Sequence, residues 1–210
     1  MKQKISRRKM LGALAVSGGM IGLSVSCSTS EHAPTKLAAK KTDGTPMQFF
    51  PKNGPDANPQ LNDIEKYPKC PYCGMNRKQW HHSRHLVHYS DNKVDPTCSL
   101  HCAAISLSLN IDRQPIAIYA ADYGSNEKIK PLINVDEAAY LVGSKLPGTM
   151  TAQSKMAFAD RAMAETLQGD KGGEMADFEK ALTQSYLSMA RDTNMIRKRR
   201  AAKRKKMQHG

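Results

Sequence analysis

The residues of this sequence most able to do chemistry are four cysteines in two closely spaced pairs. Two residues separate Cys70 from Cys73, three separate Cys98 from Cys102, and 24 residues lie between the pairs. Gly74 lets the chain turn back after the first pair. A helix predicted at the second pair would place Cys98 and Cys102 on one face. Four thiolates could then converge on one tetrahedral site, which zinc, iron and Cu(I) all favour.

The same spacing permits two other interpretations. An even number of cysteines in an exported protein is typical of disulfides, so the pairs could form two disulfides, or one disulfide beside a reactive pair. Residues 70–73, Cys-Pro-Tyr-Cys, also resemble the motif of a thiol-disulfide oxidoreductase. That enzyme would need a long helix starting at the motif, whereas Gly74 follows it. Metal binding and disulfide formation remain open alternatives at this point.

Met75 shifts the metal hypothesis towards copper. A thioether adds little to a zinc site, whereas Cu(I) is soft and binds methionine well, and Met75 lies two residues after Cys73. Met75 could equally fill a core, because methionine packs in many environments. Five of the seven histidines lie between residues 81 and 101. Among them His101, flanked by the second cysteine pair, is best placed to add a nitrogen ligand.

Charge and composition narrow the classes of function. The net charge is +13, but five basic residues lie in the first nine and eight more lie between Arg197 and Lys206. The remaining 19 basic and 19 acidic residues balance, so the charge of the body gives no support for nucleic-acid binding. No nucleophilic triad, phosphate-binding loop or catalytic carboxylate pair stands out. We therefore expect a binding protein, not an enzyme.

The N-terminus has the features of an export signal. Arg7 and Arg8 form a twin-arginine pattern, and a short run of apolar and small residues follows to Val25. Cys27 then stands where bacterial lipoproteins are lipidated. Acyl chains there would hold the protein on a membrane. We expect a periplasmic protein that is anchored by lipid at Cys27, with cleavage near this position and a soluble protein as the alternative.

The elements expected from the sequence give an α+β fold of two small units, each with two strands followed by helix. Five segments are predicted: an export signal (1–27), a flexible linker rich in proline and glycine (28–66), a Cys-rich unit (67–112), a second unit (113–190) and a basic, disordered tail (191–210). Strands are expected at 84–90, 93–95, 115–119 and 132–135. Helices are expected from Thr97 to 109, from Asp160 to 169, and from about Asp177, and residues 136–142 fit either type.

Several short motifs, taken in order along the chain, resemble the NosL family, the lipoprotein accessory proteins of nitrous oxide reductase. They are Cys73-Gly74-Met75, Ala120 to Tyr123, Ala139 to Ser144, Gly148 to Met150, Ala157-Phe158, and Gly172-Gly173 before Phe178. The resemblance covers about Cys70 to Met189. It implies two related α+β units and a periplasmic chaperone that delivers Cu(I) to a copper-receiving apo-enzyme, in partnership with a membrane transporter complex.

Carried over to this sequence, the resemblance assigns Cu(I) ligation to Cys73 and Met75, and Met150 matches a methionine of the second unit. Cys70, Cys98 and Cys102 depart from the family's single-cysteine pattern. They are similar to the cysteines of small zinc-ribbon modules, so a structural four-cysteine zinc site in a sensor or interaction module is the alternative function. The twin-arginine pattern and the basic tail are not features that the family requires.

Overall fold

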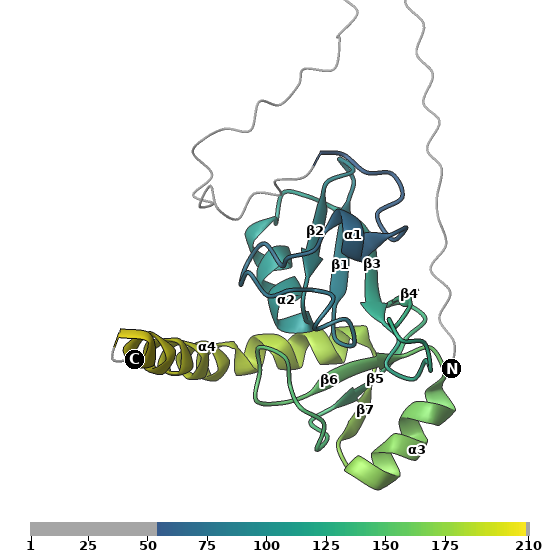
Figure 1. The fold of residues 1–210 in the computed structure, drawn as a ribbon. Helices are drawn as coiled ribbons and strands as arrows, with labels where there is room; N and C mark the ends of the chain where they lie inside the picture. The colour runs from purple at the N-terminus through teal and green to yellow at the C-terminus, as the bar shows by residue number, and fades with distance from the viewer. Residues whose placement is uncertain (1–53, 209–210) are drawn as a thin grey trace, which may run out of the picture. The chain divides into compact units, whose positions relative to one another are not determined.

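The computed structural model describes residues 54–208, and the fold there is α+β, as predicted (Figure 1). The helices are α1 (Asp63–Lys66), α2 (Leu100–Leu109), α3 (Arg161–Lys171) and α4 (Phe178–Gln208). The strands are β1 (His85–Tyr89), β2 (Val94–Thr97), β3 (Pro115–Ala121), β4 (Leu132–Asn134), β5 (Ala139–Val142), β6 (Lys155–Phe158) and β7 (Glu174–Ala176).

The first sheet has the order β2-β1-β3-β4, with every neighbouring pair antiparallel. Its central strand β1 is buried along its whole length. Val87 and Tyr89 pack with α2 on one face, and Leu86 packs with Tyr67 and Val94 on the other. Because side chains alternate between faces of a strand, both faces of this sheet are covered.

The second sheet has the order β6-β5-β7 and is also antiparallel. Tyr140 and Val142 of β5 join the core that includes α4, whereas Ala139 and Leu141 pack towards α3. The two helices therefore cover opposite faces of β5 (Figure 1). This two-sided burial explains why β5 is apolar at every position.

The two sheets share one core. Val87 and Tyr89 of the first sheet and Tyr140 of the second belong to the same buried cluster. β3 and β4 were placed in the second unit by the sequence analysis, but β3 pairs with β1 of the first sheet and β4 pairs with β3. The expected division of strands at residue 113 is therefore wrong, because β3 completes the first sheet before the chain crosses to the second.

Local signals located most elements. Asp160 caps α3 by accepting a hydrogen bond from the Ala162 amide, as expected. Residues 139–142, which fitted either type, are a strand. The N-cap of α2 is Ser99, not Thr97. The short strands β6 and β7 were not predicted, because three or four residues carry too little periodicity to be recognised.

Two segments that were expected to lack regular structure contain helices. Helix α1 lies within the predicted linker, and its Asp63 is buried in the body. α4 continues through the predicted disordered tail to Gln208. The first half of α4 packs on α2, β5 and β7, so it supplies a helical template from which the second half extends. Among the described residues, no helix has the length and apolar character needed to span a membrane.

Candidate metal centre

The first cysteine pair lies in a tight knuckle between two short paired segments. Lys69 and Asn76 form an antiparallel bridge, and the Cys70 amide donates to the Met75 carbonyl at 2.9 Å. The Gly74 amide donates to the Cys70 carbonyl at 2.9 Å, and Gly74 has φ of +77°. That conformation is easily adopted only by glycine. The knuckle therefore turns both cysteines of the pair to one side.

The second pair reaches the same place from the start of α2. Cys98 precedes the N-cap Ser99 and Cys102 lies in the first turn, so the two do not share a helix face as predicted. Their sulfurs are nevertheless 3.8 Å apart, because the extended residue before the helix directs Cys98 towards Cys102.

All four thiol sulfurs lie within 4.8 Å of one another. The Sγ atoms of Cys73 and Cys98 lie 3.3 Å apart. A disulfide needs about 2.0 Å, and all four residues are free thiols here. Separations of this size suit four sulfurs around one thiophilic ion. The sequence spacing left metal and disulfide open, and the tertiary structure gathers the thiols without joining them.

The four thiols differ in exposure. Cys70, Cys98 and Cys102 are buried, whereas Cys73 is partly exposed. An ion or an exchanging ligand can therefore reach the cluster on the Cys73 side.

Hydrogen bonding between the thiols divides them into two classes. Interaction with the Cys102 thiol lowers the pKa of Cys70 and of Cys73 below the ordinary cysteine value. The interaction with Cys70 raises the pKa of Cys102 in turn. The pKa of Cys98 is also raised: its contact with Cys102 lowers it, but contacts with Cys70 and Cys73, together with burial, outweigh that effect. Cys70 and Cys73 are thus the sulfurs that ionise first to attract a cation.

Two methionines lie against the thiols. The Met75 sulfur is 3.9 Å from the Cys98 sulfur. Met150, which comes from the loop between β5 and β6, packs on the same cluster and adopts φ of +60°. A positive φ is uncommon for a residue with a side chain. The fold therefore brings together the three residues that the family resemblance named, Cys73, Met75 and Met150.

His101 is buried beside the cluster but is not one of the four grouped ligands. Its Nδ1 atom lies 3.9 Å from the Asp192 carboxylate of α4 and has no hydrogen-bond partner. Burial lowers the pKa of His101, which favours the neutral ring. The structure thus places His101 between the cysteines and α4, facing the helix.

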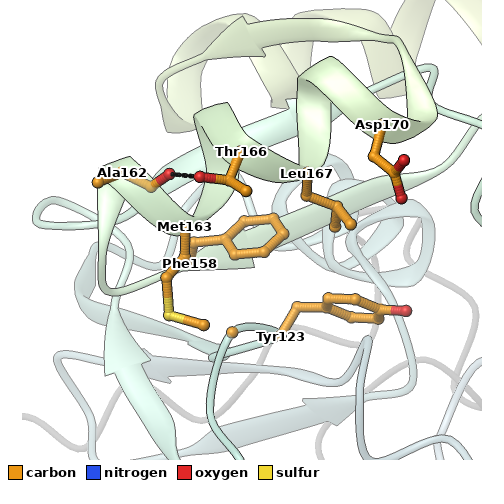
Figure 2. A pocket seen from close by; sticks show the side chains of 8 residues that line it. Tyr123, Phe158, Ala162, Met163, Thr166, Leu167 and Asp170 are labelled. Atoms are coloured by element: carbon orange, nitrogen blue, oxygen red, sulfur yellow. Dashed lines mark hydrogen bonds between the residues drawn. The ribbon is translucent and has the colours of Figure 1, made fainter.

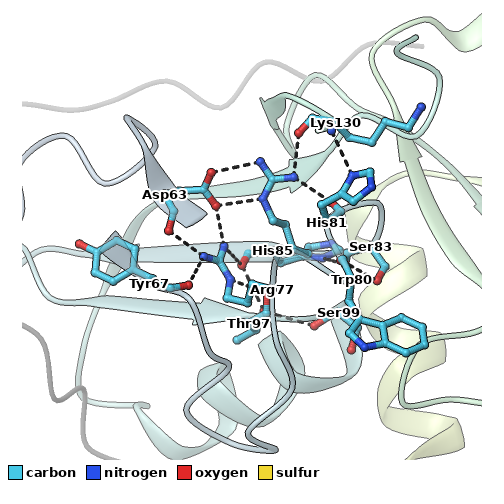
Figure 3. Close-up of polar contacts among 11 residues, drawn as sticks. Asp63, Tyr67, Arg77, Trp80, His81, Ser83, His85, Thr97, Ser99 and Lys130 are labelled. Carbon is cyan, nitrogen blue, oxygen red and sulfur yellow. Dashed lines mark hydrogen bonds and ion pairs between the residues drawn. The ribbon is translucent and has the colours of Figure 1, made fainter. Parts of the chain in front are cut away.

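A buried arginine joins the knuckle to the segment that carries the second cysteine pair. Nothing in the sequence indicated this role. Arg77 is fully buried and donates to the main-chain carbonyls of Asp63, Tyr67 and Thr97 (Figure 3). Its guanidinium also pairs with the Asp63 carboxylate at 2.8 Å. Thr97 immediately precedes Cys98, and Arg77 follows Met75 by two residues. One side chain therefore fixes the knuckle against the second cysteine pair.

The Asp63 carboxylate accepts from a second arginine as well. Arg84 donates to both of its oxygens, at 2.9 and 3.1 Å. Asp63 was assigned to the linker by sequence. The only signal that could have marked it is the isolated Asp-Ile-Glu-Lys segment, which has the composition of a short helix but no partner visible in sequence.

Tyr72 anchors the knuckle from the other side. Its hydroxyl donates to the Asp95 carboxylate of β2, which also accepts from Ser106 of α2 at 2.6 Å. Burial raises the pKa of Asp95. Because Tyr72 lies between Cys70 and Cys73, this contact restrains the first pair relative to the helix that carries Cys102.

A hollow lies beneath α3, away from the cysteine cluster (Figure 2). It measures about 480 Å³, and Tyr123, Phe158, Met163 and Leu167 form most of its wall. No thiol or imidazole lines it, so it lacks the donor set of the cysteine cluster. The predicted lipidation residue, Cys27, lies outside the described residues.

Comparison with known proteins places the fold and the centre in context. The chain is 24% identical to the copper chaperone NosL from Shewanella denitrificans, known from a crystal structure, with 53% of this chain and 87% of that chain covered and a TM-score of 0.45. It is 21% identical to the apo-NosL protein from Achromobacter cycloclastes, solved by NMR, with 45% and 82% covered and a TM-score of 0.33. No curated protein matches the sequence.

The family match covers much more of the sequence than any single motif. Residues 61–187 match the NosL family, a range that begins before α1 and ends within α4 and so includes both sheets and all four clustered cysteines. Because this match spans more than half of the chain, the protein belongs to the NosL family.

Proposed function

We propose that this protein is a Cu(I) chaperone that holds the ion with sulfur ligands and passes it to a copper-receiving apo-enzyme by ligand exchange. The observation that carries the proposal is the gathering of four thiols within 4.8 Å, with the Met75 thioether 3.9 Å from Cys98 and one thiol partly exposed. Soft thiolate and thioether donors select Cu(I). An exposed ligand allows an acceptor to share the ion before it leaves.

Membership in the NosL family supports the finer parts of this proposal. The recipient would be nitrous oxide reductase, and a membrane transporter complex would be the partner at the membrane. The Shewanella denitrificans protein is described as a copper chaperone. We propose the same role for this chain because its own thiols and Met75 form a set of soft ligands. Cys73, Met75 and Met150 would hold the ion at the open side, with one or more of the buried cysteines completing the set.

The test is a Cu(I) titration of the reduced protein against a chromophoric Cu(I) chelator. We expect one Cu(I) per chain in the wild type and loss of uptake in Cys73→Ser. Met75→Leu should weaken the apparent affinity, whereas Met163→Leu, a remote methionine of α3, should not change it. Unchanged stoichiometry in Cys73→Ser would exclude the assignment.

A structural zinc site is the second candidate, and the presence of four cysteine sulfurs within 4.8 Å of one another is what favours it. Four cysteine sulfurs at tetrahedral separations are typical of structural zinc. Elemental analysis of protein purified without added metal separates the two functions. One zinc per chain that withstands mild chelation and is not displaced by Cu(I) would establish the zinc module instead.

We also propose that the protein is exported and anchored to a membrane by lipid at Cys27. The support is the Arg7-Arg8 pattern, followed by an apolar run that ends at a cysteine. In cells, Cys27→Ser should move the protein from the membrane fraction to the soluble periplasmic fraction. A Cys27→Ser protein that stays with the membrane would rule out the anchor.

A further inference from the structure

The open side of the sulfur cluster is bordered by helix α4. A hollow of about 200 Å³ lies beside Cys73, and Cys102 and Met150 also line it. Tyr72, His101 and Ile105 contribute to its wall, and from α4 come Thr193, Ile196, Arg197 and Arg200. The partly exposed thiol lines this hollow, so a carrier that enters between the cysteines and α4 can reach the cluster.

Two arginines give this opening a positive charge. Arg197 and Arg200 line the hollow, and Nη2 of Arg200 donates to the Cys73 carbonyl at 3.2 Å. They begin a stretch of eight basic residues, 197–206, that contains no acid. Residues 54–196, by contrast, hold 15 basic and 17 acidic residues. The excess positive charge of the described residues therefore lies in the last part of α4, and two of its arginines line the hollow beside the sulfur site.

The arginines are held in place by contacts earlier in the helix. The Tyr186 hydroxyl donates to the Ala104 carbonyl of α2 at 3.2 Å. The Asp192 carboxylate accepts from the Ala152 amide at 3.1 Å, two residues beyond Met150. α4 is thus tied both to the helix that carries Cys102 and to the loop that carries Met150. Its next turns present Arg197 and Arg200 to the hollow in a fixed register.

We propose that this hollow recognises a small anionic carrier of Cu(I), of the thiolate or carboxylate class, and that Arg197 and Arg200 bind the carrier's anionic groups. This inference rests on the proposed Cu(I) function of the cluster. Ionised thiolates repel an anionic complex, and guanidinium groups offset that repulsion while forming paired hydrogen bonds to carboxylates. A hollow of about 200 Å³ suits a small molecule.

The transfer step is a ligand exchange without redox change. As a bond forms between Cu(I) and the Cys73 sulfur, one bond between Cu(I) and the carrier breaks. Any proton still on the thiol passes to the released donor group of the carrier. Copper stays in the Cu(I) state throughout, so no oxidant or reductant is required.

The experiment compares two Cu(I) donors of opposite charge. The bicinchoninate complex is anionic and carries carboxylates, and the neocuproine complex is cationic. Stopped-flow absorbance at low ionic strength would follow Cu(I) transfer to the wild type, to Arg197→Gln/Arg200→Gln, and to Lys203→Gln/Arg204→Gln. The last variant is the matched control, because it removes the same charge from exposed positions of the same helix outside the hollow.

We expect Arg197→Gln/Arg200→Gln to slow transfer from bicinchoninate by about tenfold, because the variant loses local electrostatic steering of an anion. Transfer from the cationic neocuproine complex should not be slowed. The control variant should slow the bicinchoninate reaction by less than about twofold. Equal slowing by the two variants, or no slowing by the first, would overturn the inference while leaving the chaperone intact. A wild type that takes Cu(I) from neither donor would instead overturn the proposed function, and this inference with it.

Discussion

At the scale of single residues, the geometry of the candidate metal centre depends on side chains that are not themselves ligands. Arg77 connects the knuckle to the residue before Cys98, and Tyr72 connects it to Asp95. Both are buried or partly buried polar groups with several partners, and such groups are costly when a partner is removed. The geometry of the four thiols is therefore maintained by hydrogen bonds between segments that lie about twenty residues apart.

Replacing Arg77 tests this arrangement. Arg77→Met keeps an unbranched side chain but removes the guanidinium that donates to the carbonyls of Asp63, Tyr67 and Thr97. We expect the free energy of unfolding to fall by about 3 kcal/mol, as when one partner of a buried ion pair is removed. Urea denaturation of the metal-free, reduced protein would measure it.

The control is Arg161→Met, since Arg161 forms an exposed pair with Glu165 one turn along α3. Exposed pairs of this kind contribute at most about 0.5 kcal/mol. A loss of less than about 1 kcal/mol in Arg77→Met would mean that the buried network does not carry the stability assigned to it.

At the scale of elements, α4 has a packed part and an exposed part, which meet near residue 196. Its first part packs on α2 and on the second sheet, and Asp192 holds the loop that bears Met150. Its second part is exposed and basic. The sequence analysis began the basic tail at residue 191 and expected only the part before it to be helical, whereas the helix continues to Gln208.

Two truncations separate the roles of α4. A chain ending at Ile196 keeps Asp192 and should keep the thermal midpoint and the equilibrium Cu(I) affinity of the full chain. A chain ending at Ala190 lacks the acceptor for the Ala152 amide. Hydrogen exchange of that amide should then quicken by about tenfold, which corresponds to the loss of one hydrogen bond to a carboxylate.

Hydrogen exchange read by mass spectrometry or NMR would follow residues 150–153 in both chains. The melting curve of each chain shows whether the rest of α4 remains folded. If the Ala152 amide exchanged equally in the two chains, the tie between α4 and the Met150 loop would be refuted.

At the scale of the whole molecule, one of the buried contacts between the two sheets joins a histidine to a tyrosine. His85 of β1 stacks on Tyr140 of β5, with 3.1 Å between His85 Nε2 and the Tyr140 hydroxyl. Burial lowers the pKa of His85 to about 4, from an ordinary value of 6.5. The folded protein therefore keeps this ring neutral at pH values where the unfolded chain would protonate it.

This difference predicts a loss of stability in acid. Between pH 6.5 and about 4 the unfolded chain binds a proton that the folded chain does not, so the free energy of unfolding falls as the pH is lowered through this range. The contribution of one such group is about 3 kcal/mol over the full interval. Urea denaturation at a series of pH values would show a shallower dependence in His85→Gln than in the wild type. Parallel curves would contradict the assignment to His85.

Sequence alone determined the chemistry and most of the local structure. The paired cysteines, Met75, the turn at Gly74, the cap at Asp160 and the family motifs are all visible along the chain, because each depends on neighbours within a few residues. The tail and the strands β6 and β7 were not determined in this way. The strands β6 and β7 are short, and packing on the rest of the fold decides their structure. The tail is helical because it extends a helix that is already packed.

Only the tertiary structure decided which groups meet. It brought the two cysteine pairs together, placed Met150 against them, turned His101 towards Asp192, and set Arg197 and Arg200 at the mouth of the site. These contacts join residues up to 127 positions apart. Spacing in sequence fixes geometry only within one element, whereas contacts between elements follow from how the buried faces of the sheets and helices pack.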